Sequence, residues 1–139
     1  MTIEERAKIA SEYKATGKYN CTRAVIAAFE DVIKIDPEEI TMLTAGFAAG
    51  MATMEGTCGA VIGAVIVAGA LTEGKGTLKA SKIILEKFKE LSGSLVCKTL
   101  KGLDDKEIMT PCPKCVENAI LALGYAVDVK KTPYAELFN

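Results

Sequence analysis

The fold is decided by residues 57–72, which read TCGAVIGAVIVAGALT. Between its terminal threonines this stretch carries only apolar or small side chains. A helix that is apolar on every side must be buried, so we expect Cys58 to about Thr72 to form a central helix, with Thr57 as its cap. The apolar run Ala60–Leu71 is shorter than the ~18 residues that a membrane span needs. No membrane insertion is therefore expected.

Capping residues and glycines divide the rest of the chain into further helices. Ser, Thr, Asp and Asn side chains accept hydrogen bonds from the free N–H groups at a helix start, and glycine often follows a helix end. Because alternating strand patterns and hairpin turns are scarce, we expect one all-α domain over residues 1–139, a compact bundle of about six helices around the Gly/Ala-rich central one. The other expected helices run from Thr2 to Gly17, from Asn20 through CTRAVIAAFEDVI, from Asp36 to about Met54, from the Gly74–Gly76 turn to Gly93 with Leu78, Leu85, Phe88 and Leu91 on its apolar face, from Ser94 to Lys101, and, after a polar linker at Asp104–Thr110, from Pro111 to about Val127.

Glycines inside two of these helices indicate close packing. A glycine in a helix costs about 1 kcal/mol relative to alanine, so Gly46, Gly50, Gly59 and Gly63 need a reason. At i, i+4 spacing the missing side chains share a face, and two helix backbones can approach closely there. Plain tight packing explains the pattern. The same glycines also leave room beside Cys58, which makes Gly59 and Gly63 candidate cofactor-contacting positions.

Charge and residue counts exclude several classes of function. The chain has 17 basic and 18 acidic residues and a formal net charge of −1, so it lacks the basic patch that binds nucleic acid. It contains no histidine, which excludes a Ser–His–Asp triad, a Cys–His pair and a histidine-ligated zinc or haem. Five cysteines remain. Sulfur chemistry is therefore the leading expectation.

The first residues carry no secretion signal. Met1–Arg6 is charged and of mixed sign, with no apolar stretch before a cleavage site. We therefore expect a cytoplasmic protein, in which thiols are kept reduced. In that setting five cysteines favour metal binding or redox work over a framework of structural disulfides.

Every cysteine falls at or within the first turn of an expected helix. The free N–H groups and the positive end of the helix dipole stabilise a thiolate there, and the thiolate is both the nucleophile and the metal ligand. Small buried side chains are the alternative explanation, because free cysteine is among the most buried residue types. The five are Cys21 after Asn20, Cys58 after Thr57, Cys97 after Ser94, and the pair in Cys112-Pro113-Lys114-Cys115.

Two motifs are ruled out by their neighbours. Val116, not histidine, follows the Cys-x-x-Cys pair, so c-type haem attachment is excluded. Residues 69–75, GALTEGK, have the spacing of a phosphate-binding loop, but Gly76 stands where Ser or Thr would hold magnesium. Neither haem nor a nucleotide is expected.

The ordered cysteines and their neighbours resemble the C_GCAxxG_C_C family of redox-active proteins. Residues 58–63, CGAVIG, have its Cys-Gly-Ala-x-x-Gly signature. The resemblance implies a small helical domain with redox function, and cysteines 21, 58, 97 and 112 as its family cysteines. The other matching segments are Tyr19-Asn20-Cys21 with Ala24 and Val25, Gly46–Met51, Gly93-Ser94-Leu95 with Cys97, and Cys112, to which Cys115 is an addition.

Three functions remain open. In the first, Cys21, Cys58, Cys97 and Cys112 (or Cys115 in its place) bind an iron–sulfur cluster or zinc, and the protein carries electrons or senses redox state. The resemblance favours iron. In the second, the protein is a dithiol–disulfide oxidoreductase that uses Cys112 and Cys115 with Cys58. In the third, it is a non-enzymatic helical binding module. The expected partners are a redox protein or a small thiol, and a homo-oligomer is consistent with the sequence.

Overall fold

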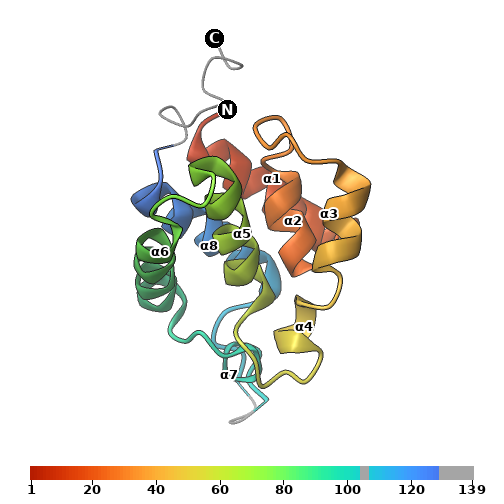
Figure 1. The fold of residues 1–139 in the computed structure, drawn as a ribbon. Helices are drawn as coiled ribbons and strands as arrows, with labels where there is room; N and C mark the ends of the chain where they lie inside the picture. Colours follow the sequence, from red (N-terminus) through yellow and green to blue (C-terminus); the bar gives the residue numbers. More distant parts are fainter. Residues whose placement is uncertain (104–106, 129–139) are drawn as a thin grey trace.

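The computed structural model describes residues 1–103 and 107–128 (Figure 1). Over these residues the regular structure is helical, and the only β pairing is an isolated bridge between Thr57 and Val96, which confirms the all-α fold. Among the described helices none has both the length and the apolar character to cross a bilayer. The helices are α1 (Ile3–Ala15), α2 (Cys21–Ala27), α3 (Pro37–Thr44), α4 (Ala48–Met51), α5 (Gly59–Thr72), α6 (Thr77–Ser92), α7 (Cys97–Leu100) and α8 (Cys112–Ala126).

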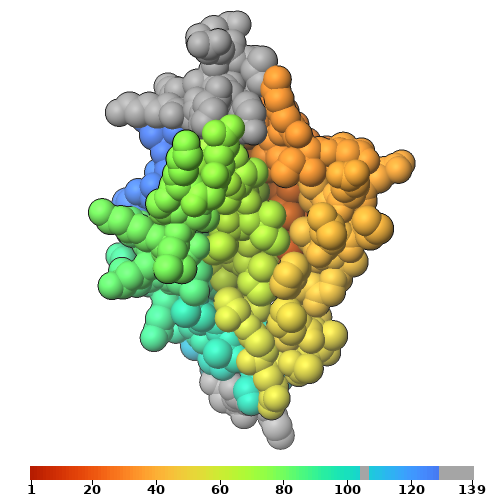
Figure 2. Space-filling view, in the orientation of Figure 1, coloured from red at the N-terminus to blue at the C-terminus, as the bar shows by residue number. Residues whose placement is uncertain are grey.

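Helices α5 and α8 form the centre of the bundle. Helix α8 packs against α1, α2, α5 and α6, and α5 packs against α2, α6 and α8. The short helices α4 and α7 lie at the end of the molecule opposite the N-terminus (Figure 1). Helix α5 is the expected buried Gly/Ala-rich helix: Ala60, Val61, Ala64 and Val67 are fully buried. A strip of α5 still reaches the surface between α6 and the α3–α4 segment (Figure 2).

Capping side chains start three helices where the sequence predicts. The Thr2 hydroxyl accepts from the Glu5 N–H at 3.1 Å, and the Asn20 side-chain Oδ1 accepts from the Arg23 N–H at 2.8 Å. Asp36 caps α3 ahead of a proline in its first turn. Two expected caps are displaced: Cys58, not Thr57, holds the N-cap position of α5, and Val96, not Ser94, that of α7. In both cases the expected cap lies in or beside the Thr57–Val96 bridge.

The expected continuous helix from Asp36 to about Met54 is wrong. Helix α3 ends at Thr44, and within and after the short α4 the chain turns through left-handed conformations. The φ angles are positive at Ala49, Gly50, Met51, Ala52 and Met54. Alanine has high helix propensity, but tertiary contacts override it here: the Lys98 N–H donates to the Met54 carbonyl, which holds the segment against α7.

The glycines of α5 approach α2, not the α3–α4 segment. A Cβ on Gly63 would lie 2.7 Å from the Thr22 carbonyl oxygen and 3.1 Å from the Val25 Cβ. One on Gly59 would lie 2.6 Å from the Cys21 sulfur. Gly46 has open space around its missing side chain. The predicted close approach therefore exists at Gly59 and Gly63, and α2 is the partner helix.

The buried face of α6 also differs from the expected one. Ala80, Ile84, Phe88 and Ser92 face the core. Leu78 is 87% exposed and Leu91 is also exposed, whereas Phe88 is buried and Leu85 packs against the core as expected. The expected linker at 104–110 lies partly outside the described residues.

Candidate functional site

The five cysteines all lie at helix starts. Cys21, Cys97 and Cys112 are the first residues of α2, α7 and α8, Cys58 is the N-cap of α5, and Cys115 is in the first turn of α8. None forms a disulfide. Cys58, Cys97 and Cys115 are buried, whereas Cys21 and Cys112 are half-buried. The predicted position of all five at helix starts is therefore confirmed. The structure also shows that the five differ in solvent exposure.

A short antiparallel contact fixes Cys58 and Cys97 relative to each other. The Cys58 N–H donates to the Leu95 carbonyl at 2.7 Å, and the Cys97 N–H donates to the Gly56 carbonyl at 3.0 Å. Gly50 packs directly against the start of α7, since a Cβ on it would fall 2.7 Å from the Cys97 Cβ. The left-handed segment before α5 thus serves to bring two cysteine helices together.

Cys58 is the cysteine whose thiolate is favoured. A hydrogen bond with the Cys115 thiol, the N–H groups of Ala60 and Val61, and the positive charge of Lys101 together lower the pKa of Cys58 to about 7, against the opposing effect of burial. The N–H groups are those at the start of α5, where a helix has unpaired donors and a partial positive charge. At neutral pH about half of Cys58 is therefore ionised.

Cys115 has the opposite character. Its hydrogen bond with Cys58, its burial, and the negative charges of Cys58, Cys112 and Cys21 raise the pKa of Cys115 far above the ordinary range. The Cys115 thiol also lies 3.5 Å from the Thr110 carbonyl, a second acceptor for its proton. Cys58 is thus the more readily ionised of the two thiols, and Cys115 stays protonated beside it.

A buried polar network holds Cys115 in place. The Thr110 hydroxyl donates to the Ser92 carbonyl at 2.8 Å, and the Asn118 amide donates to the Ser92 hydroxyl at 2.9 Å. Both contacts join α8, or the residues just before it, to the end of α6. Because buried polar groups are costly when unpaired, this network favours a single position for the start of α8.

The side chains of Cys21 and Cys97 each contact a neighbouring segment of the chain. The Cys21 sulfur lies over Gly59, and the neighbouring Thr22 hydroxyl donates to the Gly59 carbonyl at 2.8 Å. The room beside Gly59 and Gly63 is therefore taken up by α2. The Cys97 sulfur lies 3.9 Å from the Met54 sulfur. Burial, together with the charges of Cys58, Cys112 and Cys21, raises the pKa of Cys97 despite the nearby Lys101.

Lys101 is the functional residue that the sequence analysis missed. Burial would lower its pKa, but the charges of Cys112, Cys97 and Cys21 and a hydrogen bond with Cys112 raise the pKa of Lys101 overall. It supplies positive charge to the cysteine cluster from the end of α7. Its position four residues after Cys97 places it on the same helix face, and that spacing is the signal that sequence analysis could have used.

The expected metal site is not preformed. Among residues 1–103 and 107–128, no three Cys, Asp or Glu side chains gather closely enough to hold one ion. The thiols share an electrostatic environment, as their mutual effects on pKa indicate, but they do not converge on a point.

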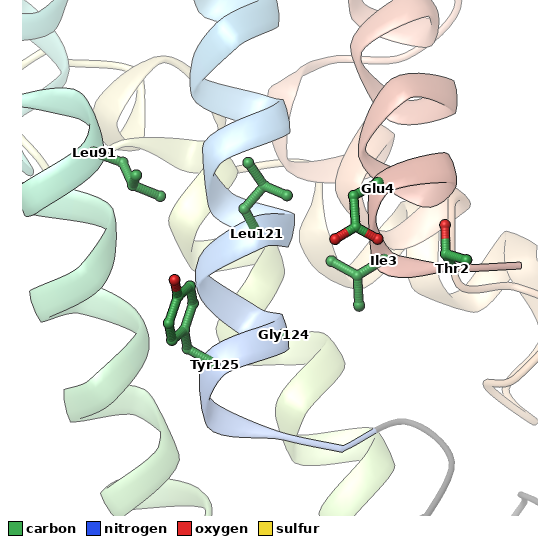
Figure 3. A pocket seen from close by; sticks show the side chains of 7 residues that line it. All are labelled: Thr2, Ile3, Glu4, Leu91, Leu121, Gly124 and Tyr125. Atoms are coloured by element: carbon green, nitrogen blue, oxygen red, sulfur yellow. The ribbon is translucent and has the colours of Figure 1, made fainter.

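A separate pocket lies away from the cysteines. It has a volume of about 610 Å³ and is lined by the start of α1 and the C-terminal ends of α6 and α8 (Figure 3). Gly124, on its wall, is twelve residues along α8 from Cys112, which corresponds to about 18 Å along a helix axis. The pocket is thus no part of the cysteine cluster.

The pKa of Cys58 gives a first testable prediction. We expect the rate of Cys58 alkylation by iodoacetamide to rise with pH through a midpoint of about 7, because the thiolate is the reactive form. In Cys115→Ala the midpoint should move upward, since the largest stabilising hydrogen bond is lost. Peptide mass spectrometry of timed samples measures both rates. A wild-type midpoint near the ordinary value of ~8.5 would contradict the prediction.

Comparison with known proteins identifies one family. A family model described as "Putative redox-active protein (C_GCAxxG_C_C)" matches residues 19–124. No curated protein and no solved structure matches the chain. The matched segment includes all five cysteines and Lys101.

Proposed function

The chain belongs to the C_GCAxxG_C_C family of redox-active proteins, and from this membership we propose that it is a dithiol–disulfide redox protein whose working pair is Cys58 and Cys115. The observation that carries the proposal is that these two thiols lie together at the buried starts of α5 and α8, where their interaction lowers the pKa of Cys58 to about 7 and raises that of Cys115. A stabilised thiolate beside a protonated thiol is the arrangement from which a disulfide forms.

The reaction exchanges one disulfide for another. A disulfide RSSR′ oxidises the pair: its S–S bond breaks, a Cys58–Cys115 bond forms, and two electrons pass from the protein sulfurs to RSSR′. The Cys58 thiolate, the Cys115 thiol and RSSR′ become the protein disulfide, one thiolate RS⁻ and one thiol R′SH, which accepts the Cys115 proton. Reduction is the reverse reaction with two small thiols or a dithiol.

The shared hydrogen bond also orders the two steps. While Cys58 is a thiolate, its charge and its hydrogen bond keep Cys115 protonated. Once Cys58 is bonded to another sulfur, both effects disappear and the pKa of Cys115 falls. Cys115 therefore becomes a nucleophile only after Cys58 has bonded to another sulfur or has taken up the Cys115 proton, which disfavours a premature side reaction of Cys115.

Disulfide mapping tests this function. The protein is purified without oxygen or chelator, equilibrated in buffers of reduced and oxidised glutathione, alkylated, and digested for peptide mass spectrometry. We expect a reversible two-electron transition in which Cys58 is joined to Cys115. A stable pair that excludes Cys58, or no reversible disulfide at all, would show the proposal to be wrong.

Metal binding is the second candidate function, and charge supports it. Negative charge on Cys21, Cys58 and Cys112 disfavours ionisation of the other two cysteines. Lys101 lies near them and supplies positive charge. A thiophilic cation would relieve this repulsion, but the sulfurs would first have to move together. Iron, zinc and acid-labile sulfide measured in the same preparation separate the two functions: stoichiometric iron with sulfide would replace the dithiol proposal.

A further inference from the structure

The working pair is shielded from solvent. Cys58 is 6% exposed and Cys115 is 3% exposed, so a bulky disulfide cannot approach either sulfur directly. Thiol–disulfide exchange requires the attacking sulfur to reach the disulfide in line with its S–S bond. A redox pair that is inaccessible in this way needs another thiol to meet the partner.

We propose that Cys112 is the entry thiol, which exchanges with the external disulfide and passes the oxidation inward through Cys115 to Cys58. This inference rests on the proposed function. Cys112 is half-buried at the start of α8, near enough to Lys101 to affect the pKa of that lysine. It lies three residues before Cys115, so the two occupy adjacent positions on one helix turn. The partner is a molecule with an exposed disulfide, either a small one or a protein.

Cys21 is the other half-buried cysteine, and its surroundings argue against this role. Its side chain packs against the hydrophobic core and over Gly59, whereas Cys112 is not among the side chains packed against that core. Cys21 also comes from α2, so no helix turn joins it to Cys115. Cys97 is excluded by burial, at 3% exposed.

The relay balances without another reactant. The Cys112 thiolate attacks RSSR′, forms a mixed disulfide with SR, and releases R′S⁻. Cys115 then attacks the Cys112 sulfur and displaces RS⁻, while its proton moves along the shared hydrogen bond to Cys58. Cys58 gives that proton to RS⁻ and attacks Cys115, which frees the Cys112 thiolate. The net products are the Cys58–Cys115 disulfide, RSH and R′S⁻, as in the direct reaction.

The experiment compares Cys112→Ser with Cys21→Ser in the full chain. Oxidised glutathione is the small probe and a disulfide-bonded peptide the large one, and the rate of Cys58–Cys115 disulfide formation is followed by quenched alkylation. We expect Cys112→Ser to slow the reaction at least tenfold, and far more than Cys21→Ser, with a larger loss for the peptide if the partner is a protein. The final fraction of disulfide in a fixed glutathione buffer should change far less than the rate, because Cys112 affects the equilibrium only through its charge near Cys115 and Lys101.

A trapping variant gives an independent readout. In Cys115→Ser the relay stops after its first step, so glutathione should accumulate on Cys112. Wild-type rates in Cys112→Ser, a greater loss in Cys21→Ser, or glutathione on Cys58 in Cys115→Ser would each overturn the entry role. Absence of a Cys58–Cys115 disulfide in the wild-type protein would instead mean that the proposed function itself has failed.

Discussion

Cys58→Ser should abolish the internal disulfide and stop oxidation at the mixed disulfide on Cys112. Serine does not ionise near neutral pH and cannot accept the Cys115 proton, and Cys115 is held protonated by its burial and by the neighbouring charges. We expect the rate of internal disulfide formation to fall at least 100-fold. The loss is measured as the fraction of protein with an internal disulfide over time in a glutathione buffer, by mass spectrometry.

Folding and a matched variant control this prediction. Serine has nearly the size of cysteine, so circular dichroism should show an unchanged helix content. Cys97→Ser is the comparison, because Cys97 is equally buried at the start of a neighbouring helix but contacts Met54 and not Cys115. Its effect should be much smaller than that of Cys58→Ser. Equal losses in both variants would contradict a Cys58–Cys115 pair and favour a metal shared by all the cysteines.

Local features of this site could be predicted from the sequence. A capping residue acts on the next three residues, so Asn20 marks the start of α2 and places Cys21 there. The same reasoning locates Cys58 and Cys112 to within one or two residues. The helix-start environment of the thiols, and so the expectation of a stabilised thiolate, is a property of short segments that needs no knowledge of the whole fold.

Long-range features could not be predicted in this way. Cys58 and Cys115 meet because α5 and α8 pack together, and no local pattern selects Cys115 over Cys112 as the partner of Cys58. The α3–α4 break has the same origin: hydrogen bonds from Cys97 and Lys98 to the preceding loop outweigh the helix propensity of an alanine-rich segment. Pairing across the chain depends on tertiary packing, which sequence periodicity does not encode.

The close contact of α5 with α2 carries the largest expected effect on stability. Even a Cβ on Gly63 would lie 2.7 Å from the Thr22 carbonyl oxygen, a backbone atom that cannot swing aside. Gly63→Leu adds three further carbons and would push α2, which carries Cys21, away from α5. Overpacking a core usually costs about 1–3 kcal/mol, and with a backbone clash we expect about 3 kcal/mol or more in the free energy of unfolding.

Gly69→Ala is the matched control for that measurement, because both glycines lie on α5. The nearest atom to a Cβ on Gly69 is the Thr77 methyl carbon at 3.8 Å, an ordinary contact distance. Replacing this helical glycine should stabilise the protein by up to about 1 kcal/mol. Urea unfolding followed by circular dichroism measures both variants. Opposite signs support the packing of α5 on α2, whereas a neutral Gly63→Leu would mean that the two helices do not approach this closely.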